Sequence, residues 1–504
     1  MATTRIELDP GNVVGPVRPE LFGSFVEHLG RCVYTGIYEP GHPLADEDGF
    51  RTDVLDLVRE LGVTTIRYPG GNFVSGYRWE DGVGPRDRRP RRLDLAWHST
   101  ETNEFGVDEF MRWSRKAGVE PMMAVNLGTR GISEAVDLLE YCNHAGGTEL
   151  SDRRRANGTP DPHGIRLWCL GNELDGPWQL GHRTAREYGR LAAETARAMR
   201  MVDPGLTLVA CGSSGSAMPT FGEWERTVLE EAYDLVDMVS AHAYYQEADG
   251  DLGSFLASPV DIDRFVATVA AAADTVREAR GATRQIAISF DEWNVWYQNG
   301  AESQLPTGDD WPVAPRLLED HYNVADAVVV GGLLISLLRN ADRVHAACLA
   351  QLVNVIAPIV TEPGGPAWKQ TIFHPFSLTA TGAVGEVLAA RVETGTYESA
   401  RYGDVPVVDA VATHDAASGA LSLFVVNRSL NEPAHLEVDM RSLGDPALLD
   451  ACTLANPDHT RTAAPAGDPA LAPAANGSAR LESGSLRVEL PPVSWSSLRL
   501  STRG

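Results

Sequence analysis

Two glutamates stand out because each follows a short apolar stretch of sequence. Residues 167–173 read Leu-Trp-Cys-Leu-Gly-Asn-Glu, and residues 286–293 read Ile-Ala-Ile-Ser-Phe-Asp-Glu-Trp. Such a stretch is typical of a buried strand, so Glu173 and Glu292 are predicted to lie at strand ends. Hydrolysis of a glycosidic bond needs one carboxylic acid to protonate the leaving oxygen and one carboxylate to handle an oxocarbenium-like carbon. Buried ion pairing is the structural alternative for the two residues.

Other polar side chains lie at the ends of further predicted strands. We expect strands at residues 21–26, 63–67, 121–126, 165–170, 206–211, 236–241, 285–290 and 344–350. The additional polar residues at their carboxyl ends are Glu27, His28, Arg67, Asn126, Asn172, His242, Tyr244, Asp291 and Gln351. Eight strands are typical of an α/β fold, the (β/α)8 or TIM barrel, whose active site forms at that rim. The sequence therefore predicts one shared site.

The segments between and after these strands support two domains. Apolar residues share one helical face in two segments, at Val54, Val58 and Leu61 and at Phe265, Val266, Val269 and Ala273. After about residue 385 apolar and polar residues alternate instead, as around Leu421 and Leu486, which predicts a C-terminal antiparallel, jelly-roll-like β-sandwich. We expect the barrel at 15–384 and the sandwich at 385–504, joined by an N-terminal strand at 1–14. The Ala/Pro/Gly-rich tract 463–477 is predicted to be a surface loop.

The charge balance restricts the partners of the chain. Its 504 residues include 43 basic and 69 acidic side chains, which gives a net charge of −26. This charge repels nucleic-acid phosphates and anionic membrane surfaces, so neither partner is expected. The basic run Arg86–Arg92 has no interleaved aromatic residues, and we interpret it as a solvated or ion-paired loop.

Cysteine and histidine usage favours a cytoplasmic enzyme without a metal. The six cysteines are scattered, which predicts reduced thiols, and Met1–Pro10 shows no signal-peptide pattern. The 13 histidines form no HExxH motif and no paired metal spacing, so we expect no catalytic metal and no cofactor.

The chain resembles glycoside hydrolase family 51, the α-L-arabinofuranosidases of clan A, over nearly its whole length. The motifs that carry the resemblance are Phe22–His28, Arg67–Phe73, Thr102–Gly106, Gly171–Glu173 and Asp291–Asn294. The resemblance implies a retaining, exo-acting enzyme that removes terminal non-reducing arabinofuranosyl residues from arabinan or arabinoxylan oligosaccharides by double displacement. It also implies a homo-oligomer, commonly a hexamer.

The resemblance also assigns residues. It implies that Glu173 is the acid/base and Glu292 the nucleophile. The residues expected to hydrogen-bond the furanose or the nucleophile are Glu27, Asn72, Asn172, Tyr244 and Gln351. We expect Arg67 to keep Glu292 ionised and His242 to orient it, although either residue could instead be a satisfied barrel residue.

Tryptophans in the predicted rim loops are candidates for sugar stacking, and Trp97 and Trp296 are expected to be subsite walls. The sugar itself stays open, because fold and carboxylates alone do not select it. An endo-glucanase, a β-xylosidase or a galactofuranosidase on the same barrel is one alternative, and loops 28–49 and 70–104 would decide between them. A catalytically silent carbohydrate-binding or scaffold protein is another. The sequence does not distinguish α-1,2, α-1,3 and α-1,5 linkages.

Overall fold

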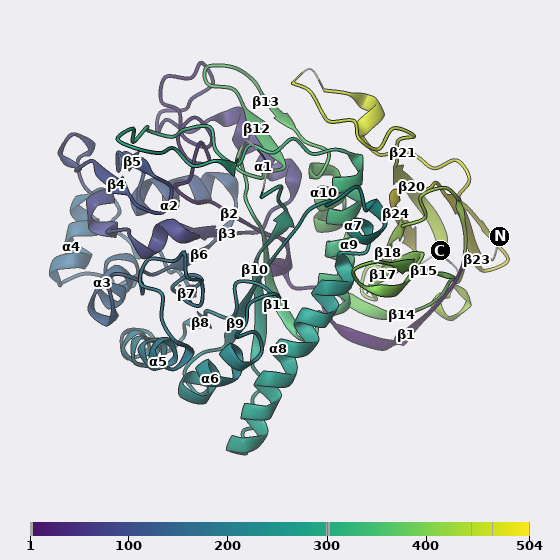
Figure 1. The fold of residues 1–504 in the computed structure, drawn as a ribbon, viewed down its shortest axis with the longest axis horizontal. Helices are drawn as coiled ribbons and strands as arrows, with labels where there is room; N and C mark the ends of the chain where they lie inside the picture. The colour runs from purple at the N-terminus through teal and green to yellow at the C-terminus, as the bar shows by residue number, and fades with distance from the viewer. Residues whose placement is uncertain (1–3, 299, 301–302, 445, 466, 503–504) are drawn as a thin grey trace.

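The chain forms a closed barrel beside a large, mostly antiparallel sheet (Figure 1). This computed structural model describes all residues except 1–3, 299, 301–302, 445, 466 and 503–504. The barrel strands are β2 (Gly23–Phe25), β3 (Thr65–Tyr68), β6 (Glu120–Ala124), β7 (Leu167–Leu170), β8 (Thr207–Ala210), β9 (Met238–Tyr245), β10 (Ala287–Val295) and β11 (Val344–Leu349). They close in the order β10-β11-β2-β3-β6-β7-β8-β9, which confirms the predicted barrel.

Two barrel strands are longer than predicted. β9 and β10 continue to Tyr245 and Val295, so Glu292 lies inside a strand and not after it. The extension is possible because β10 pairs in parallel with β9 beyond a register shift between Ser289 and Glu292, which sets Glu292 opposite His242. The irregularity therefore places both residues on the same part of the barrel rim.

Helices surround the barrel on its outer face (Figure 1). They are α1 (Thr52–Leu61), α2 (Val107–Ala117), α3 (Ile132–Asn143), α4 (Glu149–Ala156), α5 (Ala185–Val202), α6 (Glu223–Ala232), α7 (Leu252–Leu256), α8 (Pro259–Arg280), α9 (Val324–Arg339) and α10 (Phe373–Gly382). The apolar faces predicted for α1 and α8 are buried. Burial of these faces against the strands stabilises the barrel, because apolar surface leaves water.

Helix α9 joins the two domains. It contacts barrel strands β10 and β11 on one side and strands β17 (Val408–Asp415) and β18 (Ala420–Asn427) of the second sheet on the other. A helix covered on all sides is apolar all round, as the sequence of α9 is. Gly331 allows close packing, because a Cβ atom there would lie 2.2 Å from the Trp495 ring. Within the described residues, no helix is both long and apolar enough to span a bilayer.

The second domain is built on one ten-stranded sheet, in the order β21-β20-β24-β18-β17-β14-β1-β19-β23-β22. The remaining strands of this sheet are β1 (Thr4–Pro16), β14 (Glu386–Glu393), β19 (Ala434–Asp439), β20 (Ala447–Leu454), β21 (Ala474–Ala475), β22 (Arg480–Glu482), β23 (Ser485–Leu490) and β24 (Ser494–Ser501). The inward residues of strands far apart in this order, including Leu423 and Leu486, form one buried cluster. The sheet therefore closes over a core as a sandwich does.

The N-terminal strand lies inside this sheet. β1 pairs antiparallel with β14 and parallel with β19. The domain boundary at residues 384/385 stays a prediction. The tract 463–477 contains only a short 3-10 turn and β21 among its described residues, and residue 466 lies outside them.

Three short two-stranded elements complete the described sheets. They are the hairpin β4 (Arg92–Asp94) and β5 (Ser99–Glu101), the pair β12 (Ile359–Thr361) and β13 (Ala367–Lys369), and the pair β15 (Thr396–Ser399) and β16 (Gly403–Pro406). A 3-10 turn at Asn72–Ser75 follows β3. The β4–β5 hairpin and this turn both contribute residues to the barrel mouth, as described below.

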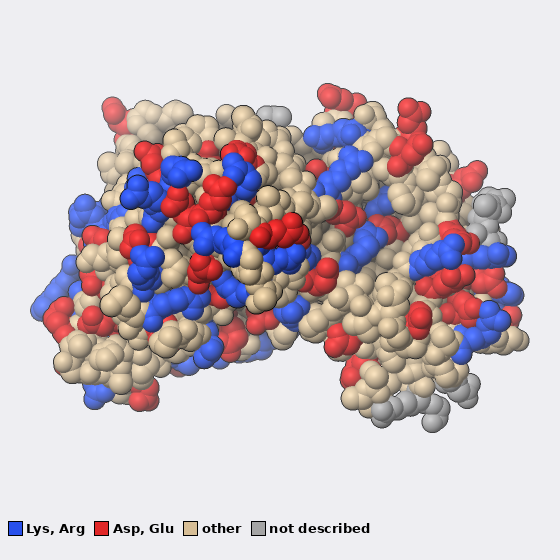
Figure 2. Space-filling model, turned by 90° about the horizontal axis from the view of Figure 1, so that it is seen from below, with Lys and Arg blue, Asp and Glu red and all other residues tan. Residues whose placement is uncertain are grey.

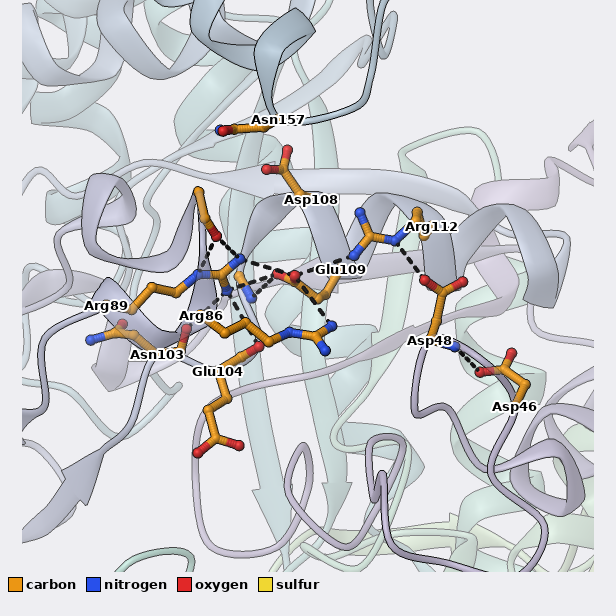
Figure 3. A network of polar contacts seen from close by, with 12 residues as sticks. Asp46, Asp48, Arg86, Arg89, Asn103, Glu104, Asp108, Glu109, Arg112 and Asn157 are labelled. Atoms are coloured by element: carbon orange, nitrogen blue, oxygen red, sulfur yellow. Dashed lines mark hydrogen bonds and ion pairs between the residues drawn. The ribbon is translucent and has the colours of Figure 1, made fainter.

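The basic run Arg86–Arg92 is largely ion-paired. The side chain of Arg89 is buried and donates to both carboxylate oxygens of Glu109 at 3.0 Å, while Arg86 donates to the same carboxylate at 3.4 Å (Figure 3). Arg89 also donates to the backbone carbonyl of Asn103, in the Thr102–Gly106 motif. These contacts tie the run to α2 and confirm the prediction of an ion-paired loop. Over the face drawn in Figure 2, basic and acidic side chains are interspersed.

Candidate active site

Glu173 and Glu292 meet at the carboxyl end of the barrel. They are 9% and 5% exposed. One oxygen from each and a ring nitrogen of His242 lie within 4.8 Å of one another. Carboxyl groups are about 5 to 5.5 Å apart in retaining glycosidases and about 6.5 to 9.5 Å apart in inverting ones. Oxygens this close favour the retaining over the inverting arrangement.

Glu292 is held at both oxygens. The Arg67 guanidinium donates to Oε1 at 2.7 Å, and the Tyr244 hydroxyl donates to Oε2 at 2.7 Å. Burial and the charge of Glu292 hold the pKa of Tyr244 well above its usual range, so this hydroxyl remains a donor. Burial alone would lower the pKa of Arg67, but the charges of Asp291 and Glu292 hold that pKa well above its usual range. Both oxygens of Glu292 thus face donors that keep their protons.

Glu173 has a different set of partners. His242 Nδ1 lies 2.8 Å from Oε1, and the Trp178 indole N–H donates to Oε2 at 2.8 Å. Glu173 follows β7 with a φ of 45°, in the left-handed region that non-glycine residues rarely adopt. Such strain is typical of functional positions, because the surrounding contacts must maintain it.

His242 connects the acidic residues of the site. Its Nδ1 faces Glu173 and lies 3.6 Å from Glu292, and its Nε2 lies 2.9 Å from the buried Asp291. Burial lowers the pKa of His242, but the charge of Glu292 and the hydrogen bonds to Asp291 and Glu173 raise it to about 10. The ring is therefore an imidazolium at neutral pH and donates from both nitrogens.

Two asparagines extend the network from Arg67. Its second terminal nitrogen donates to Asn172 Oδ1 at 2.7 Å, and Asn172 Nδ2 donates to Asn72 Oδ1 at 3.4 Å. Arg67 thus orients the Asn172 amide as well as Glu292. Both asparagines lie at the barrel mouth, on segments that follow β7 and β3.

Glu27 follows strand β2 at the barrel mouth and accepts three hydrogen bonds. The donors are the Phe73 backbone N–H at 2.9 Å, the Trp97 indole at 2.8 Å and the Gln351 amide at 3.0 Å. Burial raises the pKa of Glu27 to about 8, against the effect of the first two donors, and the charge of Glu292 adds to the rise. Gly71 makes room for this carboxylate, because a Cβ atom there would lie 2.2 Å from it.

The expected subsite tryptophans both reach this cluster. Trp97 lies in the β4–β5 hairpin and contacts Glu27, as described above. The Trp296 ring packs edge-on against Tyr244, with centroids 5.1 Å apart, and its N–H donates to Ser303. The structure therefore brings the other nine predicted site residues to the barrel mouth that holds Glu173 and Glu292: Glu27, Arg67, Asn72, Trp97, Asn172, His242, Tyr244, Trp296 and Gln351.

Other rim residues do not join the cluster. Asn126 accepts hydrogen bonds from the backbone of its own loop, and His28 bonds Glu101 and Tyr68. Tyr245 bonds Asp261, and Trp293 is fully buried. These residues support the loops and the core and lie outside the carboxylate pair.

Sequence reasoning missed two contacts. As a tryptophan of a rim loop, Trp178 is predicted by its sequence position only to stack on sugars, yet it donates a hydrogen bond to Glu173. Asp291 stood in a motif but received no role, although it bonds His242. Adjacency to Glu292 was the available signal for Asp291. No spacing rule identifies an indole donor five residues after a glutamate.

Among the described residues, two groups of side chains have the spacing of metal ligands, one in the active site and one on the surface, and both already include or contact a protein cation. Glu173, His242 and Glu292 have suitable spacing, as have Asp46, Glu47 and Asp48 on the surface. In the first group, His242 is itself an imidazolium, and the Arg67 guanidinium contacts Glu292. The Lys116 ammonium contacts all three carboxylates of the second. In both places a protein cation occupies the role that a metal would take.

A closed (β/α)8 barrel with two close carboxyl groups at its mouth is the architecture of a glycoside hydrolase. Two family models match the chain: the alpha-L-arabinofuranosidase 1 domain at residues 57–260 and the alpha-L-arabinofuranosidase C-terminal domain at residues 291–494. Together with the relatives below, these matches show that the chain belongs to the α-L-arabinofuranosidases of glycoside hydrolase family 51.

Relatives match over the full chain. An intracellular exo-α-(1→5)-L-arabinofuranosidase of Streptomyces lividans is 58% identical, covering 99% of this chain and 75% of that protein. An exo-α-(1→6)-L-arabinofuranosidase of Bifidobacterium longum is 57% identical, covering 99% and 97%. The solved structure of AbfB, a family 51 α-L-arabinofuranosidase of Bifidobacterium longum, is 52% identical with a TM-score of 0.95, covering 99% of each chain.

Proposed function

We propose that the protein is a retaining, exo-acting α-L-arabinofuranosidase that removes terminal non-reducing arabinofuranosyl residues from arabinan or arabinoxylan oligosaccharides. The observation that carries the proposal is the close pair of Glu173 and Glu292, each with its own set of hydrogen-bond donors. The family membership supports the sugar, and the spacing of the pair supports double displacement.

Glu292 is the nucleophile in this proposal. Arg67 and Tyr244 hold its carboxylate in place, so it can attack the anomeric carbon while Glu173 protonates the leaving oxygen. When the sugar forms an ester with Glu292, the negative charge that faces Glu173 and His242 disappears. Glu173 then acts as the base that activates water and releases arabinose.

The remaining residues bind the furanose. Asn172 is oriented by Arg67 and is suited to hold the sugar 2-hydroxyl, an interaction that strengthens at the transition state. Asn72, Glu27 and Gln351 present polar atoms from the neighbouring strands, and we assign them to the other hydroxyls. Trp97 and Trp296 close the site with aromatic walls.

The alternatives have less support. Solved structures of a bifunctional glucanase-xylanase and of a family 44 xyloglucanase are only 13% and 12% identical to this chain, so they share the fold alone. A silent binding protein would not need the Glu292 contacts to Arg67 and Tyr244. Relatives are named for both α-(1→5) and α-(1→6) linkages, and we propose α-(1→5) because several relatives carry that name.

Location and assembly are part of the proposal. Several relatives are named intracellular enzymes, which supports a cytoplasmic location. We propose a homo-oligomer, with a hexamer as the expected form. Light scattering coupled to size exclusion checks this: a hexamer has about six times the chain mass of 54.4 kDa, and a peak at the monomer mass contradicts it.

Hydrolysis of an aryl α-L-arabinofuranoside tests the function. The wild-type protein should release arabinose and, by NMR of the first product, the α anomer. Glu292→Ala should lose turnover, whereas Glu194→Ala, which removes an exposed glutamate of α5, should keep it. Cleavage of aryl xylosides or galactofuranosides in preference to the arabinofuranoside would replace this proposal by one of its alternatives.

A further inference from the structure

Asp291 is a fully buried carboxylate next to the catalytic pair. Its Oδ1 lies 2.9 Å from His242 Nε2, and its Oδ2 accepts from the Ser289 hydroxyl at 3.2 Å and from the Cys169 thiol at 3.8 Å. It is 0% exposed, so it cannot touch substrate. Any effect on the reaction must therefore pass through a neighbour.

We propose that Asp291 is a positioning residue for the acid/base: it fixes His242 as a donor to Glu173 and thereby orients the Glu173 carboxyl group toward the leaving oxygen. The proposal rests on the proposed function. It assigns Asp291 to leaving-group protonation, even though Asp291 adjoins the nucleophile in sequence.

The contacts favour His242 over Arg67 as the route. Asp291 and His242 form a direct hydrogen bond, whereas Arg67 Nε lies 3.9 Å from Asp291 Oδ2 and makes no hydrogen bond within the described residues. The terminal nitrogens of Arg67 donate instead to Glu292 and Asn172. Among the described residues, Asp291 is the acceptor that faces His242 Nε2, and it therefore sets the orientation of the ring at that nitrogen.

The proton arrangement explains why a charged Asp291 matters. As an imidazolium, His242 donates from Nδ1 to Glu173 Oε1, which leaves Oε2 to carry the proton for the leaving group. As a neutral ring with its proton on Nε2, it presents a lone pair to Oε1. Glu173 must then turn its own proton toward His242 and away from substrate. Asp291 favours the first state, because an adjacent anion stabilises the cation.

Several groups face His242 and act on its charge. They are Glu173 from the segment after β7, Asp291 and Glu292 from β10, Tyr244 from its own strand β9 and, across Glu292, Arg67 from β3. Among these, Asp291 is the one that neither contacts substrate in the proposed mechanism nor holds the nucleophile. It can therefore be changed without removing a reacting group.

The test is a leaving-group series measured on Asp291→Asn. kcat/KM is determined for aryl α-L-arabinofuranosides from dinitrophenyl, whose leaving group needs no proton, to phenyl, whose leaving group does. We expect kcat/KM to fall about tenfold or more for the phenyl substrate and less than about twofold for the dinitrophenyl substrate, because only the former uses the acid. In a plot of kcat/KM against pH for the phenyl substrate, the fall on the alkaline side should move to lower pH, because the His242 imidazolium loses an adjacent anion that stabilises it.

An equal fall on every substrate would overturn the proposal, because it would place Asp291 behind the nucleophile or in the fold alone. Asp326→Asn is the matched control: Asp326 is equally buried but bonds Tyr297 and the start of α9. The ratio of kcat/KM between the two substrates should stay at the wild-type value in this control.

Ser289→Ala removes a hydrogen bond to Asp291 but leaves its charge, and it should show the same trend as Asp291→Asn more weakly. This second variant keeps the test open if Asp291→Asn does not fold. Failure of the wild-type protein on both substrates would instead refute the proposed function.

Discussion

Replacing Arg67 with methionine should destabilise the barrel strongly. Arg67 and Glu292 are 1% and 5% exposed, and their charged groups are 2.7 Å apart. The substitution keeps most of the side-chain volume but leaves Glu292 and Asp291 without their guanidinium. Removing one partner of a buried pair costs about 3 to 5 kcal/mol, since the other charge stays desolvated. We expect a loss of that size in the free energy of unfolding.

Denaturant unfolding followed by tryptophan fluorescence measures this loss. The control is Arg197→Met in the exposed pair with Glu194, which should change the free energy of unfolding by less than about 1 kcal/mol. A double-mutant cycle of Arg67→Met with Glu292→Gln should give a coupling of about 1 to 3 kcal/mol, because the two residues share one contact. Equal losses for the Arg67 and Arg197 variants, or no coupling, would refute the reasoning.

Three further predictions concern Glu27 and its two neighbours Gly71 and Trp97. Burial raises the pKa of Glu27 in the folded protein from 4.5 to about 8, so between these pH values the folded state holds a proton that the unfolded state has released. The free energy of unfolding of the wild type should therefore fall, relative to that of Glu27→Gln, as pH rises from 4.5 to about 8. Denaturant unfolding at several pH values checks this. Gly71→Ala should lower kcat/KM far more than Gly118→Ala, because both glycines have positive φ but only the first Cβ would meet Glu27; equal activities would contradict this. Trp97→Phe removes the indole donor to Glu27 and should raise KM more than it lowers kcat; an unchanged KM argues against a subsite wall.

The barrel could be predicted because its signals are local. Each strand is a short apolar run, and polar residues at the carboxyl ends of parallel strands must meet at one rim. These signals predict Glu173, Glu292 and Arg67 at the barrel rim, where the structure also has their side chains in one network. The lengths of β9 and β10 were not predictable, since the extension depends on the register shift near Ser289, a property of the paired strands and not of either sequence alone.

Contacts made by loops were predicted less completely. Trp178 reaches Glu173 because the chain turns back after a residue with positive φ, and no periodic pattern marks that turn. Asp291 is buried inside the barrel, where a charge is rare unless it is paired. Its role follows only from the position of His242 on the adjacent strand. The ion pairs of Arg89 likewise depend on Glu109, twenty residues away.

Azide rescue tests the assignment of Glu173 and Glu292 most directly. Each glutamate is replaced by alanine, and each variant is given an activated aryl α-L-arabinofuranoside with azide. If Glu173 is the acid/base, azide attacks the ester on Glu292 in the Glu173→Ala variant and yields the α-arabinosyl azide, with the configuration of the substrate. In Glu292→Ala, azide replaces the missing nucleophile and yields the β-azide. The opposite pattern, with the β-azide from Glu173→Ala and the α-azide from Glu292→Ala, would contradict the account.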